Sequence, residues 1–216
     1  MHWIVPGLII AGAVFFTVKQ TPAAKTGGQE RMLPLGTQAP DFHLKDVVSG
    51  KTISRDDFAG KQALVVIFLC RHCPYVQHVK EGLVQMGRDY AGTGVAIVGI
   101  SSNDPAAYPD DAPARLKEMA VQDGFPFPIL FDETQEVAKA YTAACTPDPF
   151  VFDRNRHLVY RGQFDGSRPG GKQPVTGKDL REAIDAVLAG RPVNPDPRSS
   201  VGCSIKWKPG NEPVVR

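Results

Sequence analysis

A buried strand followed at once by two cysteines constrains this chain more than any other feature. Residues 63–69 (ALVVIFL) form an unbroken apolar run rich in Val, Ile and Phe, the pattern of a strand buried on both faces of a parallel sheet. After the cysteines, apolar residues recur at spacings of three and four, which predicts a helix. They are Val76, Val79, Leu83, Met86 and Tyr90. The segment therefore predicts a strand and a helix with two thiols at their junction.

Cys70 and Cys73 form the C-x-x-C pair, read Cys-Arg-His-Cys. The first turn of a helix brings two such sulfurs within bonding range, and its unpaired N–H groups favour a thiolate. Arg71 and His72 add one permanent and one conditional positive charge, which favour the same ionised form. We predict a redox dithiol in which Cys70, at the exposed start of the helix, attacks and Cys73 resolves. A stabilised reduced form also predicts a potential more oxidising than that of thioredoxin.

The strand, the C-R-H-C pair, the helix and a downstream Thr146-Pro147 together resemble the thioredoxin superfamily. Within it, the chain is most similar to the peroxiredoxin-like group of alkyl hydroperoxide reductase and thiol-specific antioxidant (redoxin) domains. It also resembles the extracytoplasmic thiol-disulfide oxidoreductases. The likeness covers about residues 35–190 and includes a G-x-x-A-P-D-F pattern at 36–42. It implies an α/β, thioredoxin-like fold, with a central mixed β-sheet flanked by helices.

The same resemblance makes Pro147 a candidate site residue. In the superfamily the proline at this place is cis, and its loop packs against the dithiol. A cis X-Pro bond turns the backbone back on itself and exposes the N–H and C=O of the preceding residue, here Thr146, to an incoming chain. We therefore expect Pro147 and Thr146 to support the binding of a partner polypeptide.

Strand-like and helix-like segments alternate along the rest of the chain, which is typical of an α/β sheet. The predicted strands are 42–44, 51–53, 95–101, 128–131, 150–152 and 158–161, and the predicted helices after the first are 114–122, 133–141 and 177–189. A chain of 216 residues with an ordinary composition is long enough for one well-packed domain with extensions. We predict a domain at 35–190, a linker at 20–34 and a C-terminal tail at 191–216.

The N-terminal segment 1–19 is predicted to be a membrane anchor or a signal segment. Residues 3–18 carry no charge, and this run is shorter than the ~20 residues that span a bilayer comfortably. An uncleaved anchor and a cleavable export signal both remain open. Lys19 and Lys25 follow the run, which by the positive-inside rule would keep the domain in the cytoplasm. We nevertheless expect export and a tether through residues 3–18, because tethered dithiol proteins are common outside the cytoplasm.

The other two cysteines, Cys145 and Cys203, have three alternative roles. They could form a second disulfide that clamps the tail over the site, or Cys145 could resolve a mixed disulfide. Cys145 could also be a buried, inert thiol. Around Cys203 the tail carries Ile205 and Trp207 within a stretch rich in Pro, Gly and Ser, and this cluster predicts that the tail docks on the domain.

Three competing functions are less well supported. Peroxiredoxins carry P-x-x-x-T/S-x-x-C, and neither cysteine of the pair has the required Pro and Thr or Ser before it, so disulfide exchange ranks above a thiol peroxidase. A structural zinc site would need a second C-x-x-C, which Cys145 and Cys203 do not form. Pro74 after Cys73 excludes the C-x-x-C-H motif of covalent haem, so we expect no cofactor.

The expected partners follow from the same chemistry and from the charge balance. They are protein thiols and disulfides, or peroxide, together with an unidentified electron donor or acceptor. With 25 basic and 23 acidic residues and no concentrated basic stripe, the chain lacks the charge pattern of nucleic-acid binding. A metal or redox-partner binding module that uses the same thiols is the third functional class.

Overall fold

A central mixed sheet organises the protein. The structure, a computed structural model, describes residues 1–2 and 32–213. Seven strands lie in the order β2-β1-β5-β4-β3-β7-β8. Their bounds are β1 His43–Asp46, β2 Thr52–Ser54, β3 Ala63–Phe68, β4 Val95–Ser101, β5 Ile129–Phe131, β7 Asp148–Phe152 and β8 Leu158–Arg161. Because β3 pairs parallel with β4 and antiparallel with β7, the sheet is mixed, which confirms the predicted fold class.

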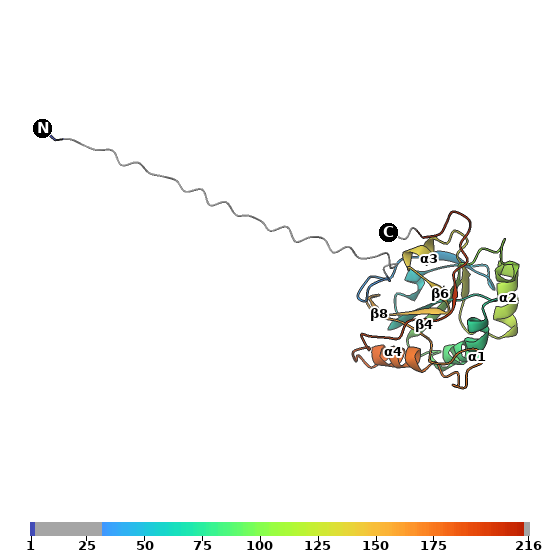
Figure 1. The fold of residues 1–216 in the computed structure, drawn as a ribbon. Helices are drawn as coiled ribbons and strands as arrows, with labels where there is room; N and C mark the ends of the chain where they lie inside the picture. The colour runs from blue at the N-terminus through green and yellow to red at the C-terminus, as the bar shows by residue number, and fades with distance from the viewer. Residues whose placement is uncertain (3–31, 214–216) are drawn as a thin grey trace.

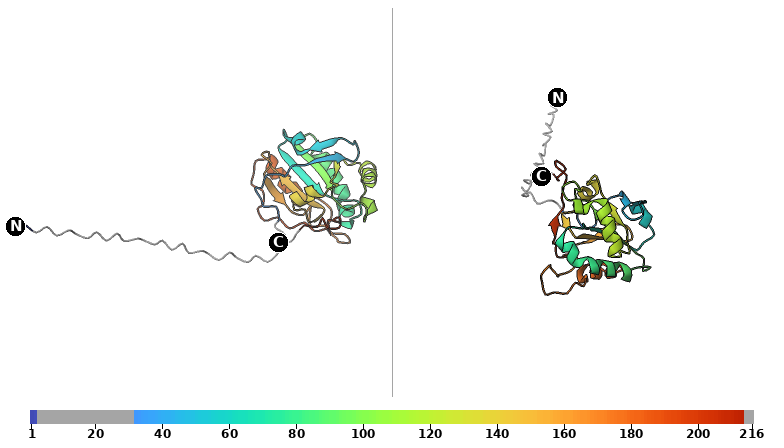
Figure 2. Two further views of the ribbon diagram at one scale, coloured as in Figure 1. Left: turned by 90° about the horizontal axis from the view of Figure 1, so that it is seen from above. Right: turned by 90° about the vertical axis from the view of Figure 1, so that its right-hand side faces the viewer.

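Helices cover both faces of this sheet (Figures 1 and 2). The α-helices are α1 Pro74–Asp89, α2 Pro113–Gln122, α3 Glu136–Ala140 and α4 Lys178–Leu188, and the short 3-10 helices are η1 Arg55–Phe58 and η2 Pro109–Asp111. Figure 1 shows α1 and α4 along one side of the sheet, with α3 on the other. The helices agree with the predicted segments, although α3 is shorter at both ends.

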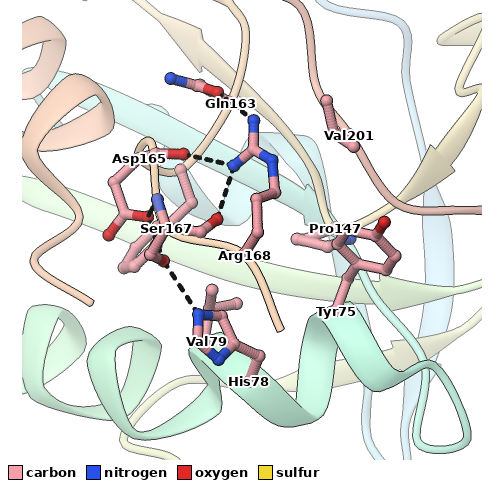
Figure 3. A pocket seen from close by; sticks show the side chains of 10 residues that line it. Tyr75, His78, Val79, Pro147, Gln163, Asp165, Ser167, Arg168 and Val201 are labelled. Carbon is pink, nitrogen blue, oxygen red and sulfur yellow. Dashed lines mark hydrogen bonds between the residues drawn. The ribbon is translucent and has the colours of Figure 1, made fainter. Parts of the chain in front are cut away.

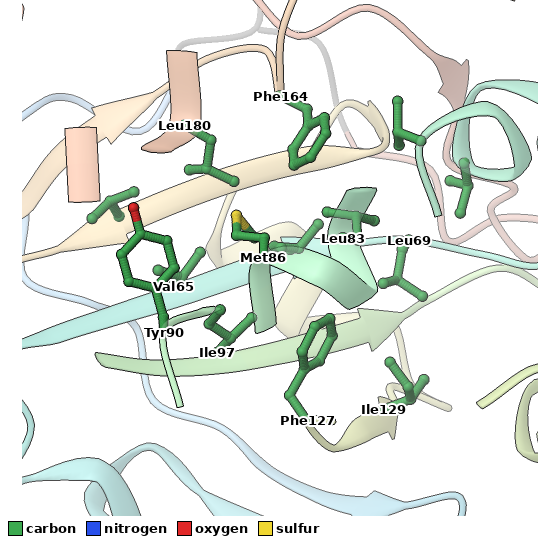
Figure 4. Close-up of a cluster of buried hydrophobic side chains, with 14 of the residues drawn as sticks. Val65, Leu69, Leu83, Met86, Tyr90, Ile97, Phe127, Ile129, Phe164 and Leu180 are labelled. Atoms are coloured by element: carbon green, nitrogen blue, oxygen red, sulfur yellow. The ribbon is translucent and has the colours of Figure 1, made fainter. Parts of the chain in front are cut away.

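Strand β3 is the centre of the hydrophobic core because both of its faces are covered. Val65 and Ile67 point into the cluster that the side chains of α1, α2 and α4 complete (Figure 4). Leu64, Val66 and Phe68 point into the opposite cluster, beneath α3. Burying each such side chain contributes about 1.5–3 kcal/mol. The buried strand therefore holds the start of the cysteine pair rigidly in place.

A separate two-stranded sheet brings the C-terminal tail back to the domain. Strand β6 Cys145–Thr146 pairs antiparallel with β9 Cys203–Ser204. Ile205, just after β9, is only 3% exposed, and Trp207 packs against the same hydrophobic cluster as Phe68. The tail docks as its apolar residues predicted.

The predicted anchor or signal at residues 3–18 lies outside the described residues. Within residues 32–213, no helix has both the length and the apolar character needed to cross a bilayer.

A buried ion pair ties the tail and the β6 segment to the main sheet. The Asp148 carboxylate lies 3.1 Å from Arg161 Nη2, and the two side chains are 1% and 6% exposed. The same carboxylate accepts hydrogen bonds from the Ala144 N–H at 3.1 Å and from Ser200 Oγ at 2.7 Å. One side chain thus connects β7, β8, the residue before β6 and the tail.

We predict that Arg161→Met lowers the free energy of unfolding by about 3–5 kcal/mol, because the Asp148 carboxylate would stay buried without its cation. Urea unfolding at neutral pH measures this change. Arg115→Met is the matched control: Arg115 forms an exposed pair with Glu118 within one helix, and its loss should cost less than about 1 kcal/mol. Equal effects of the two substitutions would contradict the role given to the buried pair.

Candidate active site: a buried dithiol beneath the tail

The two cysteines of the pair lie where β3 gives way to α1. Cys70 follows the strand by two residues, and Cys73 is the residue that caps the N-terminus of α1. Pro74 begins the helix, since proline has no N–H and its fixed φ suits the first helical position. The prediction that Cys70 occupies an exposed helix start is therefore wrong. Cys73 holds that position instead, and both cysteines are 0% exposed.

Thr146 contacts both sulfurs. Its hydroxyl Oγ1 lies 3.2 Å from Cys70 Sγ, and its carbonyl oxygen lies 3.2 Å from Cys73 Sγ, where it accepts a hydrogen bond from the protonated thiol. The Thr146–Pro147 peptide bond is cis, as the resemblance implies. The structure thus brings Cys70, Cys73, Thr146 and Pro147 together although 73 residues separate the two halves of the site.

Asp111 holds the loop between the two cysteines. Its Oδ1 accepts hydrogen bonds from the backbone N–H groups of Arg71 at 2.7 Å and of His72 at 3.1 Å. Its Oδ2 pairs with His72 Nδ1 and accepts a hydrogen bond from Asn103 Nδ2 at 2.8 Å. The carboxylate is completely buried. The sequence analysis did not single out Asp111.

The two charged residues of the motif contact side chains of neighbouring segments. The Arg71 guanidinium lies 3.7 Å from a Glu118 carboxylate oxygen and 3.9 Å from one of Asp110. The His72 ring stacks on Tyr108 with ring centroids 5.0 Å apart. Arg71 and His72 therefore shape the loop through these contacts, beyond the charge effect predicted for them.

Several hydrogen bonds favour a thiolate on Cys73. The bond between the two sulfurs lowers the pKa of Cys73 and raises that of Cys70. Burial and the Asp111 carboxylate raise the Cys70 pKa further, whereas Cys203, the Thr146 hydroxyl and the Val76 N–H also favour the Cys73 thiolate. The Thr146 carbonyl opposes ionisation of Cys73, because a carbonyl oxygen can accept a hydrogen bond only from the protonated thiol. The several donors outweigh this single acceptor, so the net effect is a lower Cys73 pKa.

We predict that a thiolate absorbance near neutral pH belongs to Cys73. In the reduced protein the 240 nm absorbance should persist well below pH 7 and disappear in Cys73→Ala. Cys70→Ala should keep the absorbance but move its loss to higher pH, because the Cys73 thiolate loses its hydrogen-bond donor. A band that survives in Cys73→Ala and vanishes in Cys70→Ala would assign the thiolate to Cys70 instead.

The remaining cysteines lie on opposite sides of the β6–β9 pair. Cys203 stands directly opposite Thr146 in the register, is partly exposed, and packs against the hydrophobic cluster that contains Cys70 and Cys73. Cys145 precedes Thr146, so its side chain points to the other face, where burial raises the pKa to about 12. All four cysteines are free thiols. The structure therefore does not bring Cys145 and Cys203 together in the predicted clamp, because the strand alternation separates them.

A small pocket adjoins the cis-proline (Figure 3). Pro147 and Tyr75 line one side, and Val201 of the tail lies nearby. His78 forms a hydrogen bond of 3.1 Å with Ser167 Oγ at its floor, and Arg168 donates hydrogen bonds to the carbonyl oxygens of the neighbouring loop. Apolar and polar side chains thus both line this pocket next to Pro147.

Three side chains near the dithiol could approach a metal ion. Ligand atoms of Cys70, His72 and Asp111 lie within 4.8 Å of one another. The Asp111 oxygens, however, already accept four hydrogen bonds, two of them from the backbone of the motif. A metal ion would have to replace the bonds that hold the loop, so the group fits a structural role better than a metal site.

We predict that Asp111→Ala destabilises the protein by at least about 1–3 kcal/mol, because the buried donors of the motif loop and of Asn103 lose their acceptor. The substitution should also lower the Cys70 pKa, since the nearby negative charge is removed. Urea unfolding and thiol titration measure the two effects. Asp110→Ala, at a largely exposed neighbour, should change the free energy of unfolding by less than about 0.5 kcal/mol. Equal losses in both variants would refute the role of Asp111.

The chain is similar in sequence to known proteins. The sequence profile of the AhpC/TSA family matches residues 35–161. The "Thiol-disulfide oxidoreductase ResA" of Bacillus cereus is 27% identical over 187 residues, which cover 84% of this chain and 90% of that protein.

Two solved structures show the same architecture. An uncharacterized conserved protein from Geobacillus kaustophilus is 52% identical, with a TM-score of 0.81 over 83% of this chain and 95% of that one. A thiol:disulfide interchange protein of the thioredoxin family from Chlorobium tepidum is 22% identical, with a TM-score of 0.56 over 71% of this chain and 97% of that one. The second likeness shows the fold alone, and that fold is thioredoxin-like.

Proposed function

The chain belongs to the AhpC/TSA family, and from this premise we propose that it is a thiol-disulfide oxidoreductase that works through Cys70 and Cys73. One observation carries the proposal: Thr146, beside the cis-proline, contacts both sulfurs at 3.2 Å. The likeness to ResA, whose name states this activity, supports the same reaction. The substrates are then protein thiols and disulfides.

The reaction uses the two thiols in turn. The Cys73 thiolate attacks one sulfur of a substrate disulfide, which breaks that bond, forms a mixed disulfide and releases one substrate thiolate. The Cys70 thiol gives its proton to the released sulfur and attacks Cys73 Sγ, so that the Cys70–Cys73 disulfide forms and the second substrate sulfur leaves. Two electrons pass from the pair to the substrate, and every step is reversible. These roles are the reverse of those predicted from the motif alone, and the hydrogen bonds that lower the Cys73 pKa support this assignment.

A thiol peroxidase is the second candidate, and a specific contact favours it. The Thr146 hydroxyl lies beside Cys70 Sγ, as the hydroxyl of the peroxiredoxin motif lies beside its cysteine. In that case a peroxide would oxidise one thiol to a sulfenic acid, and the other thiol would resolve it with release of water. The Pro of that motif has no counterpart before either cysteine, which ranks this reading second.

We place the domain outside the cytoplasm. The support is the uncharged segment 3–18, which has the composition of an export signal or anchor, and the resemblance to extracytoplasmic oxidoreductases. A protease-accessibility assay on intact and on lysed spheroplasts tests this location. Protection of the domain in intact spheroplasts would contradict it.

We predict that the reduced full-length chain reacts faster with a disulfide-bonded protein than with hydrogen peroxide in single turnover. Cys73→Ser should lower the rate with the protein disulfide by at least about 1,000-fold, since the nucleophile is lost. Cys145→Ala, on the opposite face of β6, should stay within about twofold of the wild type.

The outcomes separate the candidates. A Cys73-dependent preference for the protein disulfide establishes exchange. A preference for peroxide would make the protein a peroxidase. Inactivity towards both would overturn each of these assignments and leave thiol ligation of a metal or partner, which metal analysis of the purified protein then tests.

A further inference from the structure

The tail covers the edge of β6 and places a third thiol on the dithiol. Cys203 stands opposite Thr146 in the antiparallel register, and it packs against the hydrophobic cluster that contains Cys70 and Cys73. Cys70 and Cys73 are 0% exposed, whereas Cys203 remains partly exposed. Of the three thiols that lie together, Cys203 is the one with surface that solvent can reach.

The tail is held firmly on both sides of Cys203. On one side, Ser200 Oγ donates a hydrogen bond to the buried Asp148 carboxylate at 2.7 Å. On the other, the Lys206 N–H donates to Asn103 Oδ1 at 2.8 Å, and the Lys206 carbonyl accepts from the Asp104 N–H at 2.8 Å. These bonds, with the burial of Ile205, fix the position of Cys203 against the pair.

Gly202 shows how closely the tail approaches. A Cβ atom at this position would lie 2.0 Å from the Thr146 carbonyl oxygen and 3.2 Å from the Pro147 nitrogen. Real Cβ atoms do not approach backbone so closely, so only glycine permits this contact. Gly202 thus allows the tail to lie against the loop that contacts both sulfurs.

We propose that Cys203 is a third catalytic thiol, which relays disulfide exchange between external substrates and the buried Cys70–Cys73 pair. This inference rests on the proposed function and deepens it. Its structural basis is the juxtaposition of a partly exposed thiol with two buried ones. In the relay, Cys203 rather than Cys73 makes the first attack on an external protein disulfide, because Cys203 is the partly exposed thiol.

The relay consists of three successive thiol-disulfide exchanges. Cys203 attacks the substrate disulfide and forms a mixed disulfide, and its proton leaves with the first substrate sulfur. The Cys73 thiolate attacks Cys203 Sγ, forms a Cys73–Cys203 disulfide and expels the second substrate sulfur, which takes the proton of Cys70. Cys70 then attacks Cys73 Sγ, forms the Cys70–Cys73 disulfide and releases Cys203, which water reprotonates. The substrate gains two electrons and the buried pair loses two.

The decisive experiment traps the middle disulfide in the full-length chain. In Cys70→Ala the last exchange cannot occur, so treatment with oxidised glutathione should accumulate a Cys73–Cys203 disulfide, which non-reducing peptide mapping identifies. Cys70→Ala/Cys145→Ala should form the same cross-link. A Cys70→Ala protein that ends with glutathione on Cys73 and a free Cys203 thiol overturns the relay.

Two glycine-to-alanine substitutions, each made in the Cys70→Ala background, test whether the tail must lie this close to Thr146. Gly202→Ala should slow formation of the Cys73–Cys203 cross-link at least about tenfold, because its methyl group would collide with Thr146. Gly60→Ala adds a methyl group in open space and should leave the rate unchanged. Equal rates in these two variants would contradict the seating that the relay requires.

An activity measurement separates failure of the relay from failure of exchange itself. With an active wild type, Cys203→Ala should lower the rate with a protein disulfide at least about tenfold, and an unchanged rate rejects the relay while exchange stands. A wild type inactive with protein disulfides rejects the proposed function and with it the relay to such substrates.

Discussion

Contacts to a single residue, Thr146, hold the site together. Its hydroxyl lies against Cys70, its carbonyl against Cys73, and its strand partner is Cys203. Three thiols from distant parts of the chain meet there because the Asp148–Arg161 ion pair ties this segment to the central sheet.

Burial affects which sulfur of the dithiol ionises, and it also restricts access to both sulfurs. Because the sulfurs are desolvated, hydrogen bonds strongly affect their ionisation, and these bonds favour a thiolate on Cys73 over one on Cys70. The same burial closes the pair to large partners. A thiolate that is strongly stabilised but covered needs either a movement of the tail or an intermediate thiol, and Cys203 occupies the place where either solution would act.

The sequence predicted the fold closely because its signals were local. The apolar run at 63–69, the alternating segments and the glycines that end them determine where strands and helices begin. The position of Cys73 at the helix start was missed, although Pro74 carried the signal for it. Local signals could not predict the role of Asp111 or the position of Cys203 beside Cys73, because both depend on which loops the sheet brings to one rim. Nothing in the local sequence distinguishes Asp111 from Asp110.

The pairing of the tail also determines how a substrate can bind. An incoming strand would need the backbone of Thr146, and β9 already pairs with it. A partner must therefore displace β9 or bind beside it, where Pro147, Tyr75 and Val201 border the small pocket (Figure 3). Displacement would break the hydrogen bonds of Ser200 and Lys206 and expose Ile205, whereas binding beside β9 keeps them. The second mode is the less costly one, and it leaves Cys203 between the partner and the buried pair.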